Sequence, residues 1–379
     1  MLSRVYLDWN ATAPLRPEAR EVMEAALQIG GNPSSVHTEG REARRVVEQA
    51  RTQVAASIKA NVDDIVFTSG GTEANAQALT PDWGVGTHTF KRLIVSAIEH
   101  PSVLAGGRFA ASVTVQTPVT AAGIVDLEQL RALLATGTPA LVSIMLANNE
   151  TGAIQPVEEA AKLVHQAGGI LHVDAVQALG RMPLDVAALG ADLVTLSAHK
   201  IGGPKGAGAL VIANKNLRSA QGLIRGGGQE RNRRAGTENV IGIAGFGTAA
   251  AAASGNLAKE TELMQRLRDR LEAGLSQLAG VTIFGTGVPR LPNTTLFALD
   301  GVRAETAVIA LDLEGIAVSS GAACSSGKVQ PSHVLAAMGV NQDLARAAIR
   351  MSTGYATKVT DIDRALEAWR KLSGVLRKA

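Results

Sequence analysis

The only cysteine of the chain, Cys324, lies in a run of small residues, VSSGAACSSGK at positions 318–328. Free cysteines are usually buried and behave as small hydrophobic residues. The glycines and serines around Cys324 instead predict a surface loop, and such loops often carry function. A thiol in an exposed loop is a candidate nucleophile, and its reactivity depends on how far its surroundings favour the thiolate.

Lys200 stands in SAHKIGGPKGAG (197–208), directly after the apolar run LVTLSA. A lysine at the end of a buried strand is expected to have a lowered pKa, which suits Schiff-base chemistry. Taken alone, Lys200 would be interpreted as an ordinary surface lysine in a loop. Ser197, His199 and Asp174 together favour the catalytic interpretation.

Asp174 belongs to HVDAVQALG (172–180), where strand alternation places the side chains of His172 and Asp174 on one face. Metal binding is one interpretation of this pair. No further histidine or carboxylate cluster completes a coordination sphere, so a site with protein ligands alone is disfavoured. An acid at a strand end can instead pair with a cationic ring nitrogen, as in pyridoxal phosphate enzymes.

Two further segments have the composition of anion sites. SGGTEAN (69–75) ends an apolar run and begins a helical pattern, so its glycines and free amides suit a phosphate. The signal is weak, because a glycine turn with a threonine N-cap looks the same. The basic run IRGGGQERNRR (224–234) is either a solvated loop or a site for a small anion.

An alternating α/β pattern must position these residues. Helical spacing of apolar residues occurs at 17–28, 39–59 and 156–168, and short apolar runs alternate with such segments. This alternation predicts a largely parallel sheet covered on both faces. Ligands of such sheets bind beyond the carboxyl ends of the strands. The polar residues at those ends are Thr72, Glu73, Glu99, His100, Asn148, Asn149, Glu150, Asp174, Gln177, Ser197, His199 and Lys200.

The 379 residues exceed the usual size of one domain, so two domains are expected. The alanine- and glycine-rich segment 242–256 predicts a packed helix before a boundary, and a long helix follows from about 258 to 279. We predict an N-terminal segment at 1–15 that packs with the smaller domain and a large ligand-binding domain at 16–255. A smaller α+β domain at 256–379 would carry the mobile cysteine loop at about 319–330.

Composition excludes several classes of protein. Hydrophobic residues make up 46% and charged residues 19%, which excludes a disordered chain. A net charge of +3 and only 3% aromatic residues do not favour nucleic-acid binding. One cysteine forbids an internal disulfide, and no zinc spacing occurs. The N-terminus has no apolar signal region and no run is long enough to cross a bilayer, so we expect a cytoplasmic protein without membrane contacts.

A family resemblance follows from motifs spread in order from residue 5 to about 355. The chain resembles the cysteine desulfurases of the NifS/IscS class, which are pyridoxal phosphate enzymes related to class-V aminotransferases. The motifs that carry the resemblance are YLDWNATAP, GNPSSVHTEGR, FTSGGTEAN, EHPSV, ANNETGAIQP, HVDAVQALG, SAHKIGGPKGAG, GGGQERNRRAGTEN and SSGAACSSGKVQPSHVL.

The resemblance implies a fold-type I homodimer with a mostly parallel, seven-stranded sheet flanked by helices. Lys200 would form the Schiff base with pyridoxal phosphate, Asp174 would pair with the pyridine nitrogen, and His100 would stack on the ring. Gln177 would bond the ring hydroxyl. The phosphate would be held by Thr72, Ser197 and His199, with backbone access at Gly71, and by Thr237 from the neighbouring subunit.

The resemblance also implies the reaction. Asn149 would lie beside the cofactor and the substrate, and Arg350 would bind the substrate carboxylate as a two-pronged donor. L-Cysteine would lose its sulfur to the Cys324 thiolate and leave as L-alanine. The persulfide on Cys324 would pass to an iron-sulfur scaffold or another acceptor protein, for housekeeping or nitrogenase clusters or for tRNA thiolation. Cys324 is also the one candidate protein ligand for a transient cluster.

Alternatives remain open at this stage. Another fold-type I enzyme, such as an aminotransferase or a selenocysteine lyase, shares Asp174 and Lys200, whereas transamination needs no mobile thiol. A non-catalytic sulfur carrier on the same fold would be expected to lack part of the set. A hydrolase that pairs Cys324 with His333 leaves the lysine and the aspartate unexplained.

Overall fold

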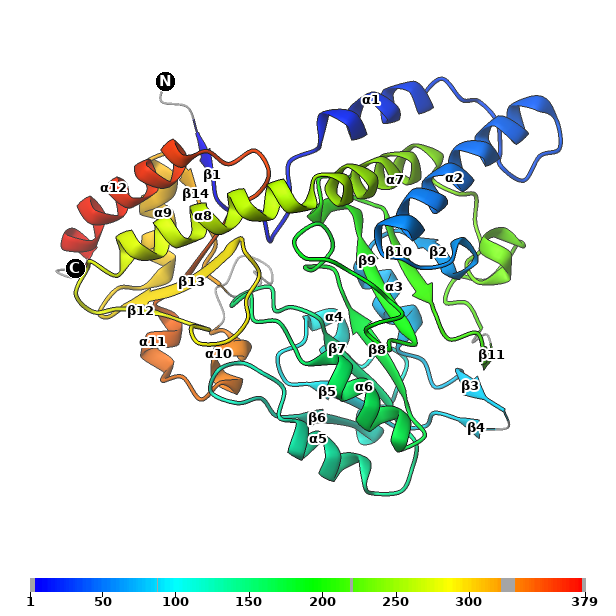
Figure 1. Cartoon of the computed structure of the whole chain (residues 1–379), viewed down its shortest axis with the longest axis horizontal. Coiled ribbons are helices and arrows are strands. Elements are labelled where there is room, and N and C mark those ends of the chain that lie inside the picture. Colours follow the sequence, from blue (N-terminus) through cyan, green and yellow to red (C-terminus); the bar gives the residue numbers. More distant parts are fainter. Residues whose placement is uncertain (1–3, 87, 219–220, 322–330, 377–379) are drawn as a thin grey trace.

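The computed structural model describes residues 4–86, 88–218, 221–321 and 331–376 (Figure 1). A seven-stranded sheet forms the centre of the larger part, in the order β2-β10-β9-β8-β7-β5-β6. Only β10 runs antiparallel to its neighbours, and the remaining pairs are parallel. The predicted mostly parallel sheet of seven strands is confirmed. The strands are β2 (Ile65–Thr68), β5 (Leu93–Ser96), β6 (Thr114–Thr117), β7 (Leu141–Met145), β8 (Ile170–Asp174), β9 (Leu193–Ser197) and β10 (Gly208–Ile212).

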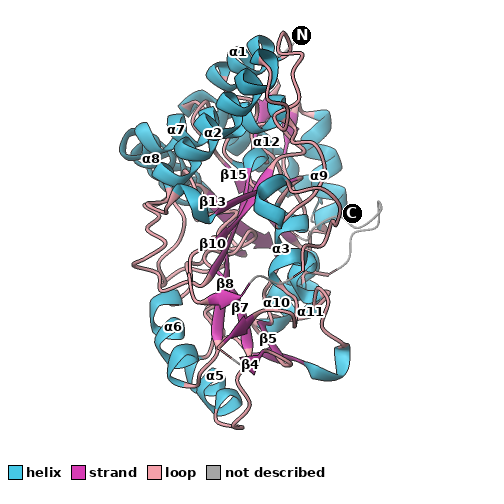
Figure 2. Cartoon of the chain, turned by 90° about the vertical axis from the view of Figure 1, so that its right-hand side faces the viewer, coloured by secondary structure: helices cyan, strands magenta, loops and turns pink. Residues whose placement is uncertain are grey.

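Apolar residues on both sides of the central strands explain why helices cover both faces of this sheet (Figure 2). In β9, Leu193 packs into one buried cluster with α3 (Gly71–Ala78) and α4 (Pro101–Leu104). Val194 and Leu196 point to the opposite cluster, with α2 (Thr38–Ser57), α5 (Leu127–Leu134), α6 (Val157–Gln166) and α7 (Val240–Gly255). Every residue of β7, β8 and β9 is buried, as expected for a two-sided parallel sheet.

Helix α7 is the alanine- and glycine-rich helix that the sequence predicted. It packs against α1 (Pro17–Ala26) and α2 at short range because Gly245 faces α1 and Gly247 faces α2. A Cβ atom at Gly247 would meet the Cα of Ala50 at 2.5 Å, so only glycine permits this crossing. After a bend, the chain continues as α8 (Leu257–Leu275), which runs from the larger part across the smaller part (Figure 1).

The C-terminal part has a second core. An antiparallel sheet, in the order β12-β13-β15, packs with α8, α9 (Ala304–Leu313) and α12 (Val359–Leu376) around Trp369 and Phe297. A further buried cluster lies under α10 (His333–Ala337) and α11 (Gln342–Arg346). The strands are β12 (Val281–Ile283), β13 (Thr294–Leu299) and β15 (Ala348–Ser352). The domain boundary near residue 255 stays a prediction that these two cores support.

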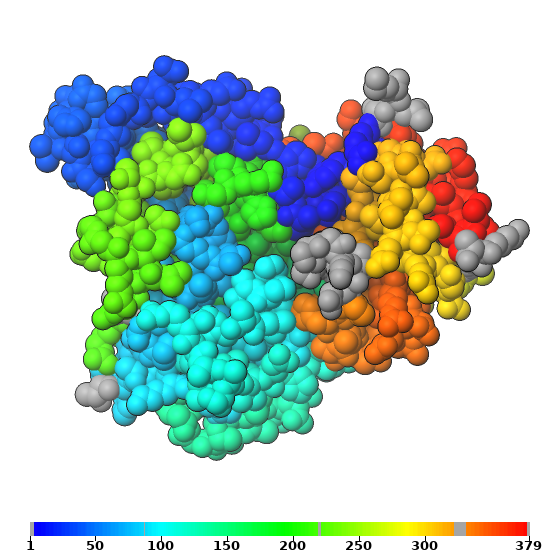
Figure 3. Space-filling model, turned by 180° about the vertical axis from the view of Figure 1, so that it is seen from behind, coloured from blue at the N-terminus to red at the C-terminus, as the bar shows by residue number. Residues whose placement is uncertain are grey.

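The N-terminal segment connects the two parts. Strand β1 (Val5–Tyr6) pairs in parallel with β14 (Ile316–Ala317), and residues 8–14 then run toward the large sheet. Viewed from behind, the dark blue residues of this segment lie between the large sheet's surface and the yellow and orange C-terminal part (Figure 3). Main-chain bonds from Ala13 to His199 and from Arg16 to Gly202 fix it beside Lys200.

Smaller elements complete the described chain. A three-stranded sheet forms at one edge, and short 3-10 helices link several strands. In the described residues no single helix is long and apolar enough to cross a membrane; only α7 and α8 together meet that criterion, with a bend of 74° between them. The elements are β3 (Gly84–Val85), β4 (His88–Thr89), β11 (Leu217–Arg218), η1 (Val62–Asp64), η2 (Ala111–Val113), η3 (Ala198–Lys200) and η4 (Gln229–Asn232).

Candidate active site

A cavity of about 480 Å³ opens at the carboxyl ends of the large sheet's strands. The strand ends, the N-terminus of α3, the segment at residues 8–11 and strand β15 all contribute to its wall. Most of the residues singled out from the sequence gather here, although their roles toward a ligand remain predictions. They are Gly71, Thr72, His100, Asn149, Asp174, Gln177, Ser197, His199, Lys200 and Arg350.

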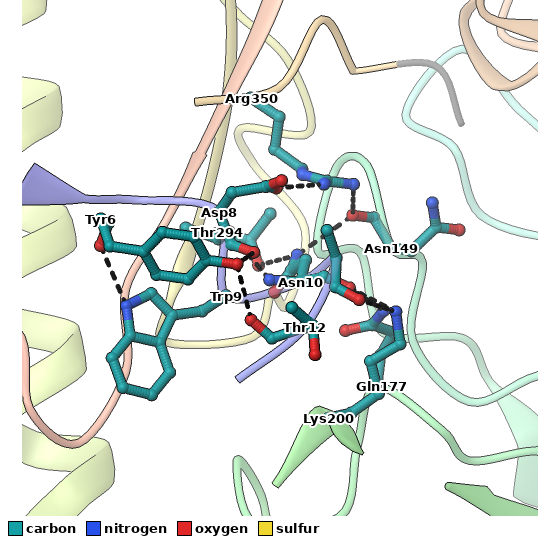
Figure 4. A network of polar contacts seen from close by, with 12 residues as sticks. Tyr6, Asp8, Trp9, Asn10, Thr12, Asn149, Gln177, Lys200, Thr294 and Arg350 are labelled. Atoms are coloured by element: carbon teal, nitrogen blue, oxygen red, sulfur yellow. Dashed lines mark hydrogen bonds and ion pairs between the residues drawn. The ribbon is translucent and has the colours of Figure 1, made fainter. Parts of the chain in front are cut away.

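Lys200 lies in η3, immediately after β9, with its amine turned toward the N-terminal segment (Figure 4). Its Nζ donates to the carbonyl oxygens of Asn10 at 2.6 Å and Ala11 at 2.8 Å. Burial, together with the positive charges of Arg350 and Arg181, lowers the pKa of Lys200 to about 7. At neutral pH a large fraction of this amine is therefore uncharged and able to act as nucleophile or base.

Asp174 ends β8 and is 7% exposed. Its Oδ2 accepts from Asn75 Nδ2 at 2.9 Å, and its Oδ1 accepts from the amide of Val176 at 3.0 Å. Asn75 also donates to the Ser102 hydroxyl, so it links α3 to α4 behind the carboxylate. In the described part of the chain no lysine or arginine forms an ion pair with Asp174. A positively charged ring nitrogen in the cavity would supply a counter-charge.

His100 precedes α4 and caps its N-terminus. Its Nδ1 accepts from the amide of Ser102 at 3.1 Å and lies 2.8 Å from that residue's hydroxyl. Because Nδ1 accepts, the proton of the neutral ring belongs on Nε2. Burial and the positive charges of Lys200 and His333 lower the pKa of His100, whereas Asp174 raises it. The ring is therefore held as a neutral imidazole at the cavity wall.

The N-terminus of α3 provides an anion cradle. The first amides of a helix have no acceptor within it, and those of Gly71 and Thr72 stand at the cavity wall. A Cβ at Gly71 would approach Val176 Cγ2 to 3.1 Å, so glycine keeps this backbone close to its neighbours. The buried hydroxyl of Ser197 has no protein partner. It is an unused donor beside these amides.

His199 completes this wall of the cavity. Its Nδ1 lies 3.2 Å from the hydroxyl of Thr12. Burial and the neighbouring charges of Lys200, Lys205 and Arg181 lower the pKa of His199 to about 4. The ring is neutral at physiological pH and can offer one N–H donor rather than a charge.

Arg350 stands on β15, at the wall opposite the large sheet (Figure 4). One terminal nitrogen donates to the carbonyl of Asn149 at 3.0 Å, and the other pairs with Asp8 at 2.7 Å. Its buried Nε has no partner. A guanidinium with a free, buried donor at a cavity wall suits a carboxylate ligand.

Arg181 and Asn10 fix the orientation of the Gln177 side chain. Its side-chain oxygen and its main-chain oxygen both accept from Arg181, and its Nε2 donates to the carbonyl of Asn10 at 3.1 Å. The amide nitrogen thus lies on the side of the cavity wall near Asn10. This orientation suits the predicted bond to a hydroxyl oxygen.

One predicted residue lines a different cavity, and another is outside the described part of the chain. Thr237 lines a separate cavity of about 210 Å³ with Glu230 and Arg234, so within one chain it does not meet the others. Cys324 lies outside the described residues. Among the described residues, Ser319 is the one nearest in sequence to Cys324 that lines the cavity. Its main chain forms two hydrogen bonds with that of Arg350, of 3.1 and 2.8 Å.

The structure places His172 in the interior of the large sheet. His172 is fully buried between the hydroxyls of Ser143, at 2.8 Å, and Thr195, at 2.9 Å, and burial lowers its pKa to about 4. It stabilises the sheet's interior and does not reach the cavity. Among the described residues no group of three or more histidine or carboxylate side chains is placed to hold a metal.

In the basic run, Arg231 pairs with Asp63 at 2.7 Å and Arg234 pairs with Glu73 at 2.9 Å. The positive charge of this segment is thus partly neutralised within the chain. Two residues of this run, Glu230 and Arg234, line the same separate cavity as Thr237.

Sequence reasoning missed several residues at the cavity. Asn10, 1% exposed, donates to Asn149 O and Thr294 Oγ1 and accepts from Asn293, and its carbonyl receives Lys200 (Figure 4). Asp8 pairs with Arg350, and Asn75 with Asp174. YLDWNATAP and SGGTEAN contain these three, so their motifs were noticed while their contacts were not.

The residues present fit pyridoxal phosphate. The free hydroxyl of Ser197 and the helix amides suit its phosphate, the unpaired carboxylate of Asp174 suits its ring nitrogen, and Lys200 is an amine with a lowered pKa for its aldehyde. These groups line one cavity. No metal is needed to account for them.

Comparison with known proteins decides the family. The aminotransferase class-V family model matches residues 5–365. The chain belongs to this family. It is thus a pyridoxal phosphate-dependent enzyme, as the sequence predicted.

Its relatives confirm the predicted resemblance to cysteine desulfurases. A cysteine desulfurase of Cereibacter sphaeroides is 44% identical over 383 residues, covering 99% of this chain and 97% of its own. The cysteine desulfurase IscS of Dictyoglomus turgidum is 41% identical over 382 residues, covering 100% and 96%. The crystal structure of a NifS-like protein from Rickettsia africae is 36% identical with a TM-score of 0.89, covering 98% of this chain and 99% of its own.

Proposed function

We propose that this class-V enzyme is a cysteine desulfurase, which converts L-cysteine to L-alanine and retains the sulfur as a persulfide on Cys324. One observation carries the proposal beyond the family. Ser319 pairs through its main chain with Arg350 at the cavity wall. Cys324 follows five residues later, a stretch that reaches at most about 17 Å when extended, so its sulfur is within reach of the cavity.

The cofactor would be held by residues that already surround the cavity. Asp174, supported by Asn75, would pair with the ring nitrogen, His100 would cover the ring face, and Gln177 would bond the ring hydroxyl. Thr72, Ser197 and His199 would hold the phosphate beside Gly71, and Thr237 would come from a second subunit. Bound there, pyridoxal phosphate supplies the electron sink that lets an amino acid lose its Cα proton.

The substrate's carboxylate would bind Arg350. The guanidinium already contacts Asp8 and Asn149, and its Nε remains free to donate. Binding on this side orients the amino acid with its amine toward Lys200, across the cavity. Asn149, whose carbonyl holds Arg350, lies beside this position.

Lys200 would move the proton at the substrate's Cα. A pKa of about 7 allows the amine to accept this proton and later release it near neutral pH. The carbonyls of Asn10 and Ala11 give the amine a defined position when it is protonated.

Cys324 would take the sulfur. Its thiolate attacks the substrate's sulfur, so an S–S bond forms while the substrate's Cβ–S bond breaks. The methylene carbon gains a proton, and alanine leaves. One thiol and one cysteine thus become one persulfide and one alanine, without an external oxidant.

Partners and location follow from this chemistry. A persulfide must be passed on, and we propose an iron-sulfur scaffold or another sulfur-acceptor protein as recipient. We propose a homodimer, since Thr237 lies outside the cavity of its own chain, and light scattering of the purified protein tests this. We propose the cytoplasm as location, where a single free thiol stays reduced.

The proposal is tested by product analysis. Purified enzyme with pyridoxal phosphate, L-cysteine and a thiol reductant is expected to release alanine and sulfide in equal amounts. Cys324→Ala should bind the cofactor and release no sulfide, and Lys200→Ala should form neither product. Sulfide release by Cys324→Ala at the wild-type rate would contradict the proposal, and keto-acid formation from an amino donor would favour an aminotransferase.

A further inference from the structure

Arg181 is a buried cation without a buried anion. It is 5% exposed and lies in the segment that follows β8, behind the cavity. Burial and the charge of Arg350 lower its pKa to about 9, so the guanidinium stays charged at neutral pH. Over the residues that the structure describes, no carboxylate pairs with it. A buried charge of this kind costs several kcal/mol unless something compensates it.

The hydrogen bonds of Arg181 all go to the framework of the active site. One terminal nitrogen donates to the main-chain and side-chain oxygens of Gln177, and the other donates to the carbonyls of Trp9 and Lys200, at 3.3 Å each. These acceptors belong to three separate segments: the N-terminal segment, the turn after β8, and η3. The guanidinium therefore holds together the main chain that presents Lys200.

The charge acts on the same lysine. The titratable and charged groups around Lys200 come from every neighbouring element, and positive ones outweigh negative ones. Arg181 stands among them on the side away from the cavity. These groups are Arg350, Arg181, Asp8, Asp174, His199 and His100.

We propose that Arg181 is a positioning residue for Lys200, whose unpaired guanidinium fixes the lysine's main chain and, as a buried positive charge, favours the uncharged amine. This deepens the proposed function, which requires that amine. Arg350 has a similar electrostatic effect but is engaged by Asp8 and is expected to be neutralised further by a substrate carboxylate. Arg181 keeps its effect throughout, since none of its partners carries a charge.

Three variants separate the charge from the hydrogen bonds. Arg181→Gln removes the positive charge but keeps N–H hydrogen-bond donors, and Arg181→Met removes both the charge and the donors. Arg181→Lys keeps the charge but loses the planar, two-pronged guanidinium. In the cofactor-free full chain, labelling of Lys200 by acetic anhydride across pH reports its protonation, with exposed Lys215 as internal reference. The pH dependence of the bound cofactor's absorption in the holoenzyme is a second readout.

We expect the labelling midpoint of Arg181→Gln and Arg181→Met to move to higher pH by about one pH unit, because a like charge has been removed. Arg181→Lys should titrate like wild type. A wild-type midpoint in both neutral variants would overturn the proposal. An upward shift of about one pH unit in Arg181→Lys would also overturn it, even if the neutral variants do not fold. Labelling needs no turnover, so the result is independent of whether the enzyme proves to be a desulfurase.

Discussion

The hydroxyl of Ser197 is a buried donor that the protein itself leaves without a partner. It stands beside the free amides of α3, where the amino-acid framework alone gives no reason for a hydroxyl. Unsatisfied buried polar atoms are costly and need an explanation. A phosphate group bound at this wall would supply one.

Ser197→Ala is therefore expected to weaken cofactor binding. Loss of a hydrogen bond to a charged group costs about 1.5–3 kcal/mol, or roughly tenfold to a hundredfold in dissociation constant. Titration of the cofactor-depleted protein with pyridoxal phosphate measures it. Ser96→Ala, at the end of β5 in the same sheet but outside the cavity wall, is the matched control. Equal affinities of the two variants would contradict a phosphate at Ser197.

Most of the residues that line the cavity could be predicted from the sequence. Asp174 ends one apolar strand and Lys200 follows another by three residues, so the parallel-sheet pattern alone predicted that they lie at one edge. It could not predict Asn10, whose bond to Thr294 joins residues 284 positions apart. Nor did it predict Arg181, because an arginine after a glycine turn looks like a surface residue. Both depend on long-range packing that has no local signal.

Helix α10 is the element that receives the chain after the cysteine segment. Its N-cap, Ser332, accepts from the amide of Leu335 and donates to Glu150 at 2.5 Å. The next residue, His333, bonds the main-chain oxygen of Glu99 at 2.9 Å. The helix is thus attached to the loops that carry Asn149 and His100.

Glu150 should make the chain's stability depend on pH. Burial raises its pKa from 4.5 to about 7, against the opposing effects of Ser332 and Arg350. The folded chain therefore binds more protons than the unfolded chain between these values, so this contribution is present at low pH and is lost as pH rises to about 7. The loss is on the order of 3 kcal/mol.

Glu150→Gln removes this titration while it keeps a side chain that can bond Ser332. Relative to wild type, the variant is expected to gain stability between pH 5 and pH 8, as measured by urea unfolding. Glu158→Gln, at an exposed glutamate of α6, is the control. A constant difference between wild type and Glu150→Gln across this range would show that Glu150 does not titrate there.

At the scale of the whole molecule, Arg16 ties the large sheet's helices to the C-terminal part. It directly precedes α1, donates to both oxygens of Glu260 on α8 at 2.8 and 2.6 Å, and donates to the carbonyl of Ile201 beside Lys200. Its guanidinium lies 4.1 Å from the centre of the Tyr355 ring. The pair is buried, so each partner depends on the other.

Arg16→Met is expected to destabilise the fold by about 3–5 kcal/mol, because it leaves the carboxylate of Glu260 buried and unpaired. The double variant Arg16→Met with Glu260→Met should recover most of this loss. Arg266→Met, which breaks an exposed pair with Glu262 on the same helix, should cost below about 1 kcal/mol. Thermal unfolding compares them, and equal losses from Arg16→Met and Arg266→Met would mean that the buried pair is not an important connection.

The sequence anticipated the sheet and the family, since strand alternation and ordered motifs persist along the chain, whereas the division into two domains stays a prediction. It did not anticipate that residues 8–16 join the two parts through Asn10 and Arg16. These joints are made of side chains from distant segments. Neither segment alone contains a sequence signal that predicts these contacts.

The proposed function depends on the transfer of the substrate's sulfur to Cys324. Mass spectrometry of the intact holoenzyme after L-cysteine is added, without reductant, tests it most directly. We expect a mass gain of one sulfur atom, mapped to the peptide that contains Cys324 and lost on reduction. One alanine should form for each sulfur atom gained. Alanine formation with no sulfur on Cys324, or the same gain in Cys324→Ala, would contradict it.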